Sequence, residues 1–291
     1  MGVAMVTAAD LRLLAIAILL FGLAWPITKH AMLDATPLWF AAVRSLGAAG
    51  ISSLLLGLRG RMVWPARQDM PTVLGVGFFQ LAVFFALAHL AVMLTSAGRT
   101  AILANVITPW LVPLSVLVLK ERVSPQRWAA AILGLAGVAA LAGPWAVNWS
   151  SPEALMGNGM LLLAALSWTI SILITRARPP EHSIAELLPW CFGLSALFLV
   201  PLAMWREPHG GIGPASYWQA AWVALVVAPI GTWSVIEIGR RLPGAVSSVA
   251  FLLVPAAGVV TAAIWLHEPV GWDLLAGGLL IAAGVIVAAR S

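Results

Sequence analysis

The chain has 291 residues, of which 62% are hydrophobic and only 9% are charged. Soluble domains carry roughly 25% charged residues, so this composition excludes a soluble globular protein and indicates a polytopic membrane protein. The net charge of +5 comes from basic residues that are scattered between apolar runs, a pattern that does not fit a nucleic-acid-binding surface.

Apolar runs of about 20 residues, the length that crosses a bilayer as a helix, recur along the whole chain. The first run is too long for the core of a cleaved signal peptide, so it is interpreted as a span. Backbone groups in hydrocarbon must be satisfied within the segment, and the runs lack the period-two alternation of barrel strands. The sequence therefore predicts an all-α integral membrane protein with ten transmembrane helices. They are expected at 10–29, 37–57, 70–91, 98–118, 126–143, 157–176, 184–204, 217–238, 245–265 and 271–289.

The basic residues predict the orientation of these spans, because cytoplasmic loops carry an excess of Lys and Arg. A cytoplasmic N-terminus would place twelve of the basic residues inside and four outside, so we expect both termini in the cytoplasm. The inner set is Arg12, Arg59, Arg61, Arg67, Lys120, Arg122, Arg127, Arg176, Arg178, Arg240, Arg241 and Arg290, and the outer set is Lys29, Arg44, Arg99 and Arg206.

Two stretches of the chain have nearly the same residue pattern. LVLKERVSPQRW (117–128) and IWLHEPVGWDLL (264–275) each run from an apolar segment through a glutamate and a turn into a new apolar segment, and their glutamates are 268 − 121 = 147 residues apart. Each half holds five spans, so the halves enter the membrane in opposite orientations. We predict a first five-helix repeat at 1–147 and a second, inverted one at 148–291, an organisation typical of secondary transporters with a site near the midplane.

The segment LTSAGRTAILANVITPWLVPLSVLVLKERVSPQRWAAAILGLAGV (94–138) carries a small-residue turn, a helix with a central proline, an L-x-E-R turn and a last helix that contains glycine. With the 5 + 5 arrangement, it resembles the drug/metabolite transporter superfamily and specifically its EamA-type members. The second half is similar but has HEP in place of the E-R turn. The resemblance implies export of amino acids or related metabolites through a central cavity in a bacterial inner membrane. Asn105 ahead of Thr108-Pro109, together with Trp168, is similar to the aromatic amino-acid exporters of that family.

Trp25-Pro26 and Trp168 are the first candidates for substrate contact. Proline removes a backbone donor and kinks a helix, which frees a carbonyl beside the Trp25 indole. Trp168 lies away from both predicted interfaces, and an indole can stack on an aromatic ligand. Alternatively, Pro26 makes a plain packing kink and Trp168 fills a helix contact.

Spans 3 and 4 carry two further sets of candidate residues. Phe79, Ala82 and Val83 share one predicted face of span 3, where small residues beside a ring can leave room for a ligand or simply pack closely. Asn105 and Thr108, at i and i+3, are expected on one face of span 4. They would either hydrogen-bond between helices or meet the ammonium or carboxylate of an amino acid.

Most of the charged and small residues inside the spans are expected to have structural roles. Arg44, about 10 Å into span 2, is expected to snorkel outward or to pair with Asp34, with a substrate carboxylate as the third alternative. Glu237 is expected to pair locally with the arginines that follow it. Small residues in spans 5 and 10 predict close helix packing and a scaffold role.

No catalytic or metal-binding motif is present, so we expect no catalytic residue, no metal, no cofactor and no enzyme activity. The leading hypothesis is an amino-acid exporter working by alternating access on a neutral or aromatic substrate. The alternatives are an exporter of lipophilic cations, which would want a central Asp or Glu that spans 1–6 lack, and an intramembrane enzyme. The expected partners are the amino acid and membrane lipid, without nucleic acid, and the chain is expected to be a monomer or a weak dimer.

Overall fold

The computed structural model describes residues 7–142, 151–241, 251 and 253–289. The described residues form helices, and their only β-type pairing is an isolated bridge between Ala35 and Ile212. In chain order these are α1 (Ala8–Ala31), α2 (Pro37–Leu58), α3 (Met70–Leu74), η1 (Gly75–Val83), α4 (Phe84–Leu94), α5 (Ala97–Leu103), α6 (Thr108–Leu119), α7 (Pro125–Ala142), α8 (Pro152–Ala177), α9 (Ile184–Arg206), η2 (Pro214–Ser216), α10 (Tyr217–Trp222), η3 (Val223–Gly231), α11 (Thr232–Arg241), α13 (Leu253–Trp265) and α14 (Trp272–Ala289). The predicted all-helical class is confirmed for the described chain.

Local sequence signals explain where several helices begin. The side chain and backbone of Thr7 pair reciprocally with those of Asp10 at the start of α1, and Ser183 does the same with Glu186 at the start of α9. Proline stands in the first turn of α2 and α8, where its missing N–H costs nothing. These signals place the ends of the long apolar helices close to the predicted boundaries.

Within the described residues, eight helical segments are long and apolar enough to cross a membrane. They correspond to eight of the ten predicted spans. The predicted span 126–143 forms α7, but Gln126 and Arg127 in its first turn lower its mean hydropathy. The predicted span 245–265 ends in the shorter apolar helix α13, and residues 245–250 and 252 lie outside the described part of the chain.

Two of the spans contain a π-helical segment instead of continuous α-helix. Residues Gly75–Val83 form η1 between α3 and α4, and residues Val223–Gly231 form η3 between α10 and α11. A π-helix bonds each N–H five residues back instead of four, so it adds a residue to each turn and rotates the faces that follow. Both π-helical segments contribute side chains to the site described below.

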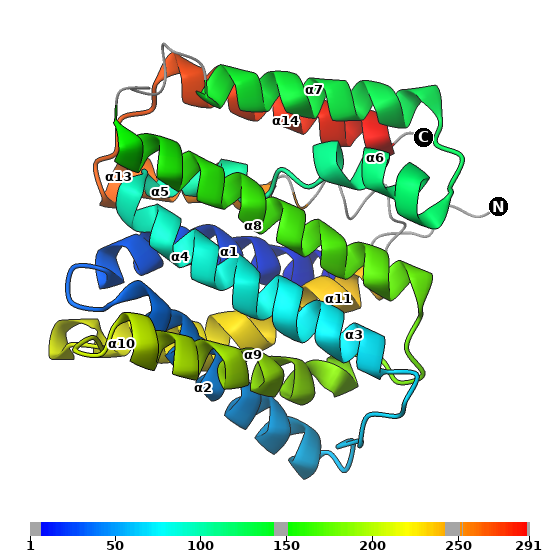
Figure 1. The fold of residues 1–291 in the computed structure, drawn as a ribbon, viewed down its shortest axis with the longest axis vertical. Helices are drawn as coiled ribbons and strands as arrows, with labels where there is room; N and C mark the ends of the chain where they lie inside the picture. The colour runs from blue at the N-terminus through cyan, green and yellow to red at the C-terminus, as the bar shows by residue number, and fades with distance from the viewer. Residues whose placement is uncertain (1–6, 143–150, 242–250, 252, 290–291) are drawn as a thin grey trace.

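Figure 1 shows the helices as a bundle with a helix pair at each edge. α7 packs along α14 at one edge, α2 packs along α9 at the other, and α1, α4, α8 and α13 lie between them. The backbones of α7 and α14 approach each other closely. A Cβ added to Gly137 would lie 2.7 Å from the carbonyl oxygen of Gly277, and a Cβ added to Gly284 would lie 2.8 Å from the carbonyl oxygen of Ala130. The predicted close packing of these two helices is confirmed.

The connections are divided between the two ends of the bundle (Figure 1). The start of α1, the end of α14 and the α2–α3, α6–α7 and α8–α9 connections lie at one end, which we call the terminal end. The α1–α2, α9–η2 and α13–α14 connections lie at the other, which we call the far end. Glu121 is therefore at the terminal end and Glu268 at the far end, so they cannot share one site. The residue before each, Lys120 and His267, has the same left-handed backbone with φ of 54°.

Candidate substrate cavity

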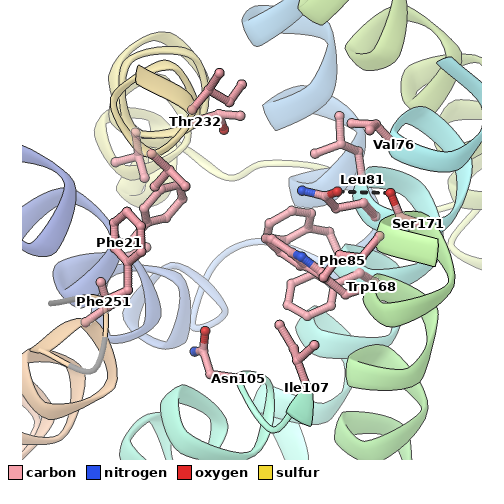
Figure 2. Close-up of a pocket in the computed structure, with 18 of the residues that line it drawn as sticks. Phe21, Val76, Leu81, Phe85, Asn105, Ile107, Trp168, Ser171, Thr232 and Phe251 are labelled. Atoms are coloured by element: carbon pink, nitrogen blue, oxygen red, sulfur yellow. Dashed lines mark hydrogen bonds between the residues drawn. The ribbon is translucent and has the colours of Figure 1, made fainter. Parts of the chain in front are cut away.

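A cavity of about 460 Å³ lies inside the bundle, within the range of about 300–1,000 Å³ that small-molecule sites occupy. Its wall is made by α1, α2, η1, α4, the α5–α6 break, α8, α9, η3, α11 and α13, so it draws on both halves of the chain. Figure 2 shows Phe21, Thr232 and Phe251 on one side and Leu81, Phe85, Trp168 and Ser171 facing them across the space.

Aromatic rings make up much of this wall. The Phe84 ring lies edge-on to Trp168 with centroids 4.8 Å apart, and 6.4 Å from the ring of Trp25. Phe85 adjoins Phe84 at 4.8 Å, and Phe21 lies on the facing side. Packing of this kind holds the indoles of Trp25 and Trp168 in place on the wall, where they could contact a ring or another apolar group.

A few polar groups interrupt the apolar surface. The Ser171 hydroxyl donates to the side-chain oxygen of Gln80 at 3.0 Å (Figure 2), which leaves the Gln80 amide nitrogen free to donate. Asn105 donates its amide N–H to the carbonyl of Ala101 at 2.7 Å and projects toward the space, so its amide oxygen remains an acceptor. These groups can fix the orientation of a polar ligand.

The structure contradicts the prediction that the Arg44 side chain snorkels outward or pairs with Asp34. Its residue is only 3% exposed, and its guanidinium carbon lies 3.3 Å from the centroid of the Phe85 ring. Asp34 is engaged elsewhere, since its carboxylate accepts the backbone N–H of Ala215 at 2.9 Å. Arg44 therefore points inward and lines the cavity.

His89 is the second titratable group buried on this wall. It is 1% exposed, and its ring lies 5.6 Å from Phe85 and 5.5 Å from Phe40. Neither Nη1 of Arg44 nor Nδ1 of His89 has a hydrogen-bond partner in the described structure. Both side chains border the same Phe85 ring, so two side chains that each carry an unpartnered polar atom lie on this part of the wall.

The predicted site residues divide into two groups. Trp25, Asn105 and Trp168 line the cavity, whereas Pro26, Phe79, Ala82, Val83 and Thr108 do not. On the third span Gln80, Leu81, Phe84 and Phe85 face the wall instead, and they lie on the side of the helix opposite the predicted face. The Phe79 carbonyl meanwhile accepts the Ser167 hydroxyl at 2.7 Å.

Asn105 and Thr108 do not share a helix face as expected. The fourth span is broken, with α5 ending at Leu103 and α6 beginning at Thr108. Pro109 stands in the first turn of α6, where it cannot donate a hydrogen bond back across the break. The break exposes Asn105 to the cavity and turns Thr108 away from it.

The sequence interpretation gave Arg44 a substrate contact only as its third alternative and did not place His89, Gln80 or Ser171 on the wall. A signal for the first two was present, because ionisable residues well inside a span are costly and commonly mark functional sites. Arg44 is the eighth residue of α2, and His89 is the sixth of α4. Gln80 and Ser171 are uncharged and carried no comparable signal, although Ser171 stands three residues after Trp168 on α8.

The two ends of the cavity differ. Toward the terminal end its wall includes Arg176, whose side chain is 41% exposed and forms an ion pair with Glu121. Toward the far end Lys29, one residue beyond the wall residue Thr28, donates to the carbonyls of Val92 at 2.5 Å and Thr95 at 2.8 Å and so ties α1 to the end of α4. The cavity therefore extends toward the terminal end. Toward the far end, the hydrogen bonds of Lys29 connect α1 with the end of α4.

The charges on the wall are all basic. Among the described residues that line the cavity there are two arginines and one histidine but no Asp or Glu. The described residues also hold no group of three or more His, Cys, Asp or Glu side chains that could bind a metal. This arrangement suits a ligand that is apolar or aromatic on one side and carries acceptor groups on another.

Comparison with known proteins gives a consistent assignment. The model of the EamA-like transporter family matches residues 11–143 and again 155–290. The uncharacterized transporter YvbV of Bacillus subtilis is 25% identical over 94% of this chain and 89% of its own length. The uncharacterized transporter YdeK of the same organism is 27% identical over 94% of this chain and 95% of its own. A protein of known crystal structure superposes with a TM-score of 0.67 over 97% of both chains at 18% identity, which concerns the fold alone. These matches do not single out the aromatic amino-acid exporters.

Proposed function

The chain belongs to the EamA-like transporter family, and we propose that it exports neutral or aromatic amino acids, or related metabolites, through the central cavity by alternating access. The observation that carries this proposal is the wall itself. Indoles and phenyl rings surround a space of about 460 Å³, and a small set of amide, hydroxyl and basic groups interrupts them. An amino acid with a large side chain offers the matching combination of an apolar ring and a compact polar end.

The two-repeat organisation is part of the same proposal. The family model matches each half once, the turns at Lys120 and His267 share one backbone conformation at opposite ends, and the two π-helical segments begin 223 − 75 = 148 residues apart. Inverted halves of this kind can rock against each other around a fixed site. The cavity wall draws on both halves, as that mechanism requires.

The proposed location is a bacterial inner membrane with the terminal end in the cytoplasm. The α2–α3, α6–α7 and α8–α9 connections, which carry Arg59, Arg61, Arg67, Lys120, Arg122 and Arg178, all lie at the terminal end. A cytoplasmic terminal end satisfies the positive-inside rule. The cavity then extends toward the cytoplasm, so the described conformation is one that could load a substrate for export.

Export of lipophilic cations is the second candidate, and the charges on the wall count against it. A cation exporter would want an embedded carboxylate, but the described wall carries only basic ionisable groups. An enzymatic role has no observation in its favour.

Purified protein in liposomes tests the proposal. Radiolabelled phenylalanine, tryptophan, threonine and a lipophilic cation are supplied with and without a pH gradient, and empty liposomes serve as the control. We expect uptake of the aromatic amino acids above the control, and the pH gradient separates proton-coupled from facilitated transport. Uptake of the lipophilic cation alone would overturn the amino-acid proposal.

A further inference from the structure

We infer that Arg44 is the anchor for a carboxylate, and that the cavity therefore selects substrates by an anionic group that the Arg44 guanidinium binds. The inference rests on the proposed transport function and goes beyond it by assigning a chemical requirement to a particular side chain. It starts from an unbalanced charge inside the bundle.

Arg44 is buried without a counter-ion in the described structure. Arg44 is only 3% exposed, its Nη1 has no hydrogen-bond partner, and its guanidinium forms no ion pair with any described residue. A buried charge without a partner is strongly destabilising. A buried arginine in this state is therefore expected to meet its partner only when a ligand supplies it.

Arg176, the other arginine on the wall, lacks this feature. Its guanidinium donates to both carboxylate oxygens of Glu121, at 2.9 and 3.0 Å, near the terminal end. Its charge is already matched within the protein. The contrast identifies Arg44 as the basic group that a ligand could neutralise.

The position of the guanidinium on Phe85 suits a planar anion. Its carbon lies 3.3 Å from the ring centroid, so one face of the group is covered by the ring. The N–H groups of guanidinium lie in its own plane and can bind both oxygens of a carboxylate at once. The ring thereby fixes the guanidinium plane while its donors remain available.

The neighbouring groups continue the same recognition surface. His89 also borders Phe85 and lines the cavity, and its buried Nδ1 has no hydrogen-bond partner among the described residues. In the other direction, Phe85 adjoins Phe84, and Phe84 adjoins Trp168, with centroids 4.8 Å apart in each step. A carboxylate at Arg44 would therefore place an attached apolar group along a row of rings.

Competition on the wild-type protein in liposomes tests the requirement directly. Uptake of radiolabelled phenylalanine is measured with 3-phenylpropionate, which keeps the carboxylate and lacks the ammonium group, and with phenethylamine, which keeps the ammonium group and lacks the carboxylate. We expect 3-phenylpropionate to inhibit at a concentration at least tenfold lower than phenethylamine. Equal inhibition by the two compounds, or stronger inhibition by phenethylamine, would overturn the inference.

The variants Arg44→Gln and Arg44→Lys test the residue. We expect Arg44→Gln to lower phenylalanine uptake at least tenfold and Arg44→Lys to retain more activity, because lysine keeps the charge but not the paired donors. Arg206→Gln is the matched control, since Arg206 also lies over an aromatic ring, that of Trp205, but is exposed and off the wall. Unchanged uptake by Arg44→Gln contradicts the inference.

Thermal unfolding in detergent separates a ligand-binding role from a structural one. Without ligand, Arg44→Gln should unfold at the same temperature as the wild type or higher, because an unmatched buried charge has been removed. With 3-phenylpropionate, only the wild type should gain stability. A lower melting temperature without ligand, together with a preserved ligand shift, would make Arg44 a structural residue.

The outcomes distinguish the inference from the proposed function. Binding and transport of 3-phenylpropionate without transport of any amino acid would uphold the carboxylate anchor and reject amino-acid export. Transport of phenylalanine that Arg44→Gln does not affect would uphold export and reject the anchor. If Arg44→Gln fails to insert, the wild-type competition and Arg44→Lys still decide the question.

Discussion

The Asp69 carboxylate and the His182 imidazole lie 2.7 Å apart and join the α2–α3 connection to the α8–α9 connection at the terminal end. The same buried carboxylate accepts the backbone N–H groups of Ala66, Glu181 and His182. A related contact stands at the far end, where Glu207, just after α9, accepts the N–H groups of Leu38 and Trp39 in the first turn of α2. Carboxylates thus fasten α9 at both ends, to the start of α3 at the terminal end and to the start of α2 at the far end.

The Asp69–His182 contact predicts a pH dependence of stability. Burial would raise the pKa of Asp69, but hydrogen bonds from His182 and the backbone outweigh it and lower the pKa to about 2. The hydrogen bond to Asp69 raises the pKa of His182 above its usual value of 6.5. The histidine's contribution is complete below pH 6.5 and is lost as pH rises through the raised pKa, while the aspartate's is lost as pH falls toward 2.

We therefore expect the melting temperature in detergent to fall between pH 5.5 and pH 8.5, and His182→Gln to flatten that fall. His209, which has no partner in the described structure, provides the control variant His209→Gln. An equal slope in the wild type and His182→Gln would show that other groups cause the pH dependence.

Glu268 is expected to stabilise the start of α5. Its carboxylate accepts the N–H groups of Ala97 and Gly98 at 2.7 and 2.9 Å, which have no partner within the helix. Glu268→Ala should therefore lower the free energy of unfolding by about 0.5–2 kcal/mol, the usual cost of losing a helix cap. Reversible denaturant unfolding in mixed micelles measures the change. Glu181→Ala, an exposed carboxylate, is the control and should stay within about 0.5 kcal/mol.

The close contact between α7 and α14 predicts that enlarging Gly137 destabilises the protein. A Cβ on Gly137 would meet Ile281 at 2.6 Å and the backbone of Gly277 at 2.7 Å, so Gly137→Val must push the helices apart. Overpacking of this kind costs about 1–3 kcal/mol. Gly193→Ala in α9 is the control, because nothing lies within 4 Å of its added Cβ. Equal melting temperatures for Gly137→Val and the wild type would show that the helices separate freely at this point.

The helical class and most of the spans could be predicted from the sequence because the signals for them are local. Length, hydropathy and charge asymmetry are properties of consecutive residues, and small residues at a spacing of four predicted that spans 5 and 10 pack closely, though not that they pack against each other. The local pair of Glu237 with Arg241 at 2.7 Å was accessible in the same way. These features need no knowledge of which helices become neighbours.

The cavity wall was harder to predict because it depends on which side of each span faces the other helices and on where a span is broken. On the third span Gln80 and Phe85 face the cavity in place of Phe79, Ala82 and Val83, and the break before Thr108 separates Thr108 from Asn105. Neither feature has a reliable pattern in one sequence. Arg44 was misjudged for another reason: its depth in α2 could be counted, but the Phe85 ring that holds it lies 41 residues away.

Trp168 provides the last prediction, which concerns transport. Its indole lines the cavity and rests edge-on against Phe84 at 4.8 Å, so it can present a face to an aromatic ligand. A contact between aromatic rings contributes about 0.5–1.5 kcal/mol beyond burial, which corresponds to roughly a 2- to 10-fold change in affinity. Trp168→Ala should therefore raise the KM for phenylalanine or tryptophan by about that factor, and Trp168→Phe should recover part of it.

The control for this prediction is Trp218→Ala, which removes an exposed indole that stacks on Trp265 away from the wall. Both alanine variants should insert and elute as the wild type does, and only Trp168→Ala should change the uptake of aromatic amino acids. A substrate without a ring, such as threonine, gains no ring contact and should show a smaller change. An equal loss for threonine and phenylalanine would mean that Trp168 supports the packing of Phe84 instead of contacting the substrate.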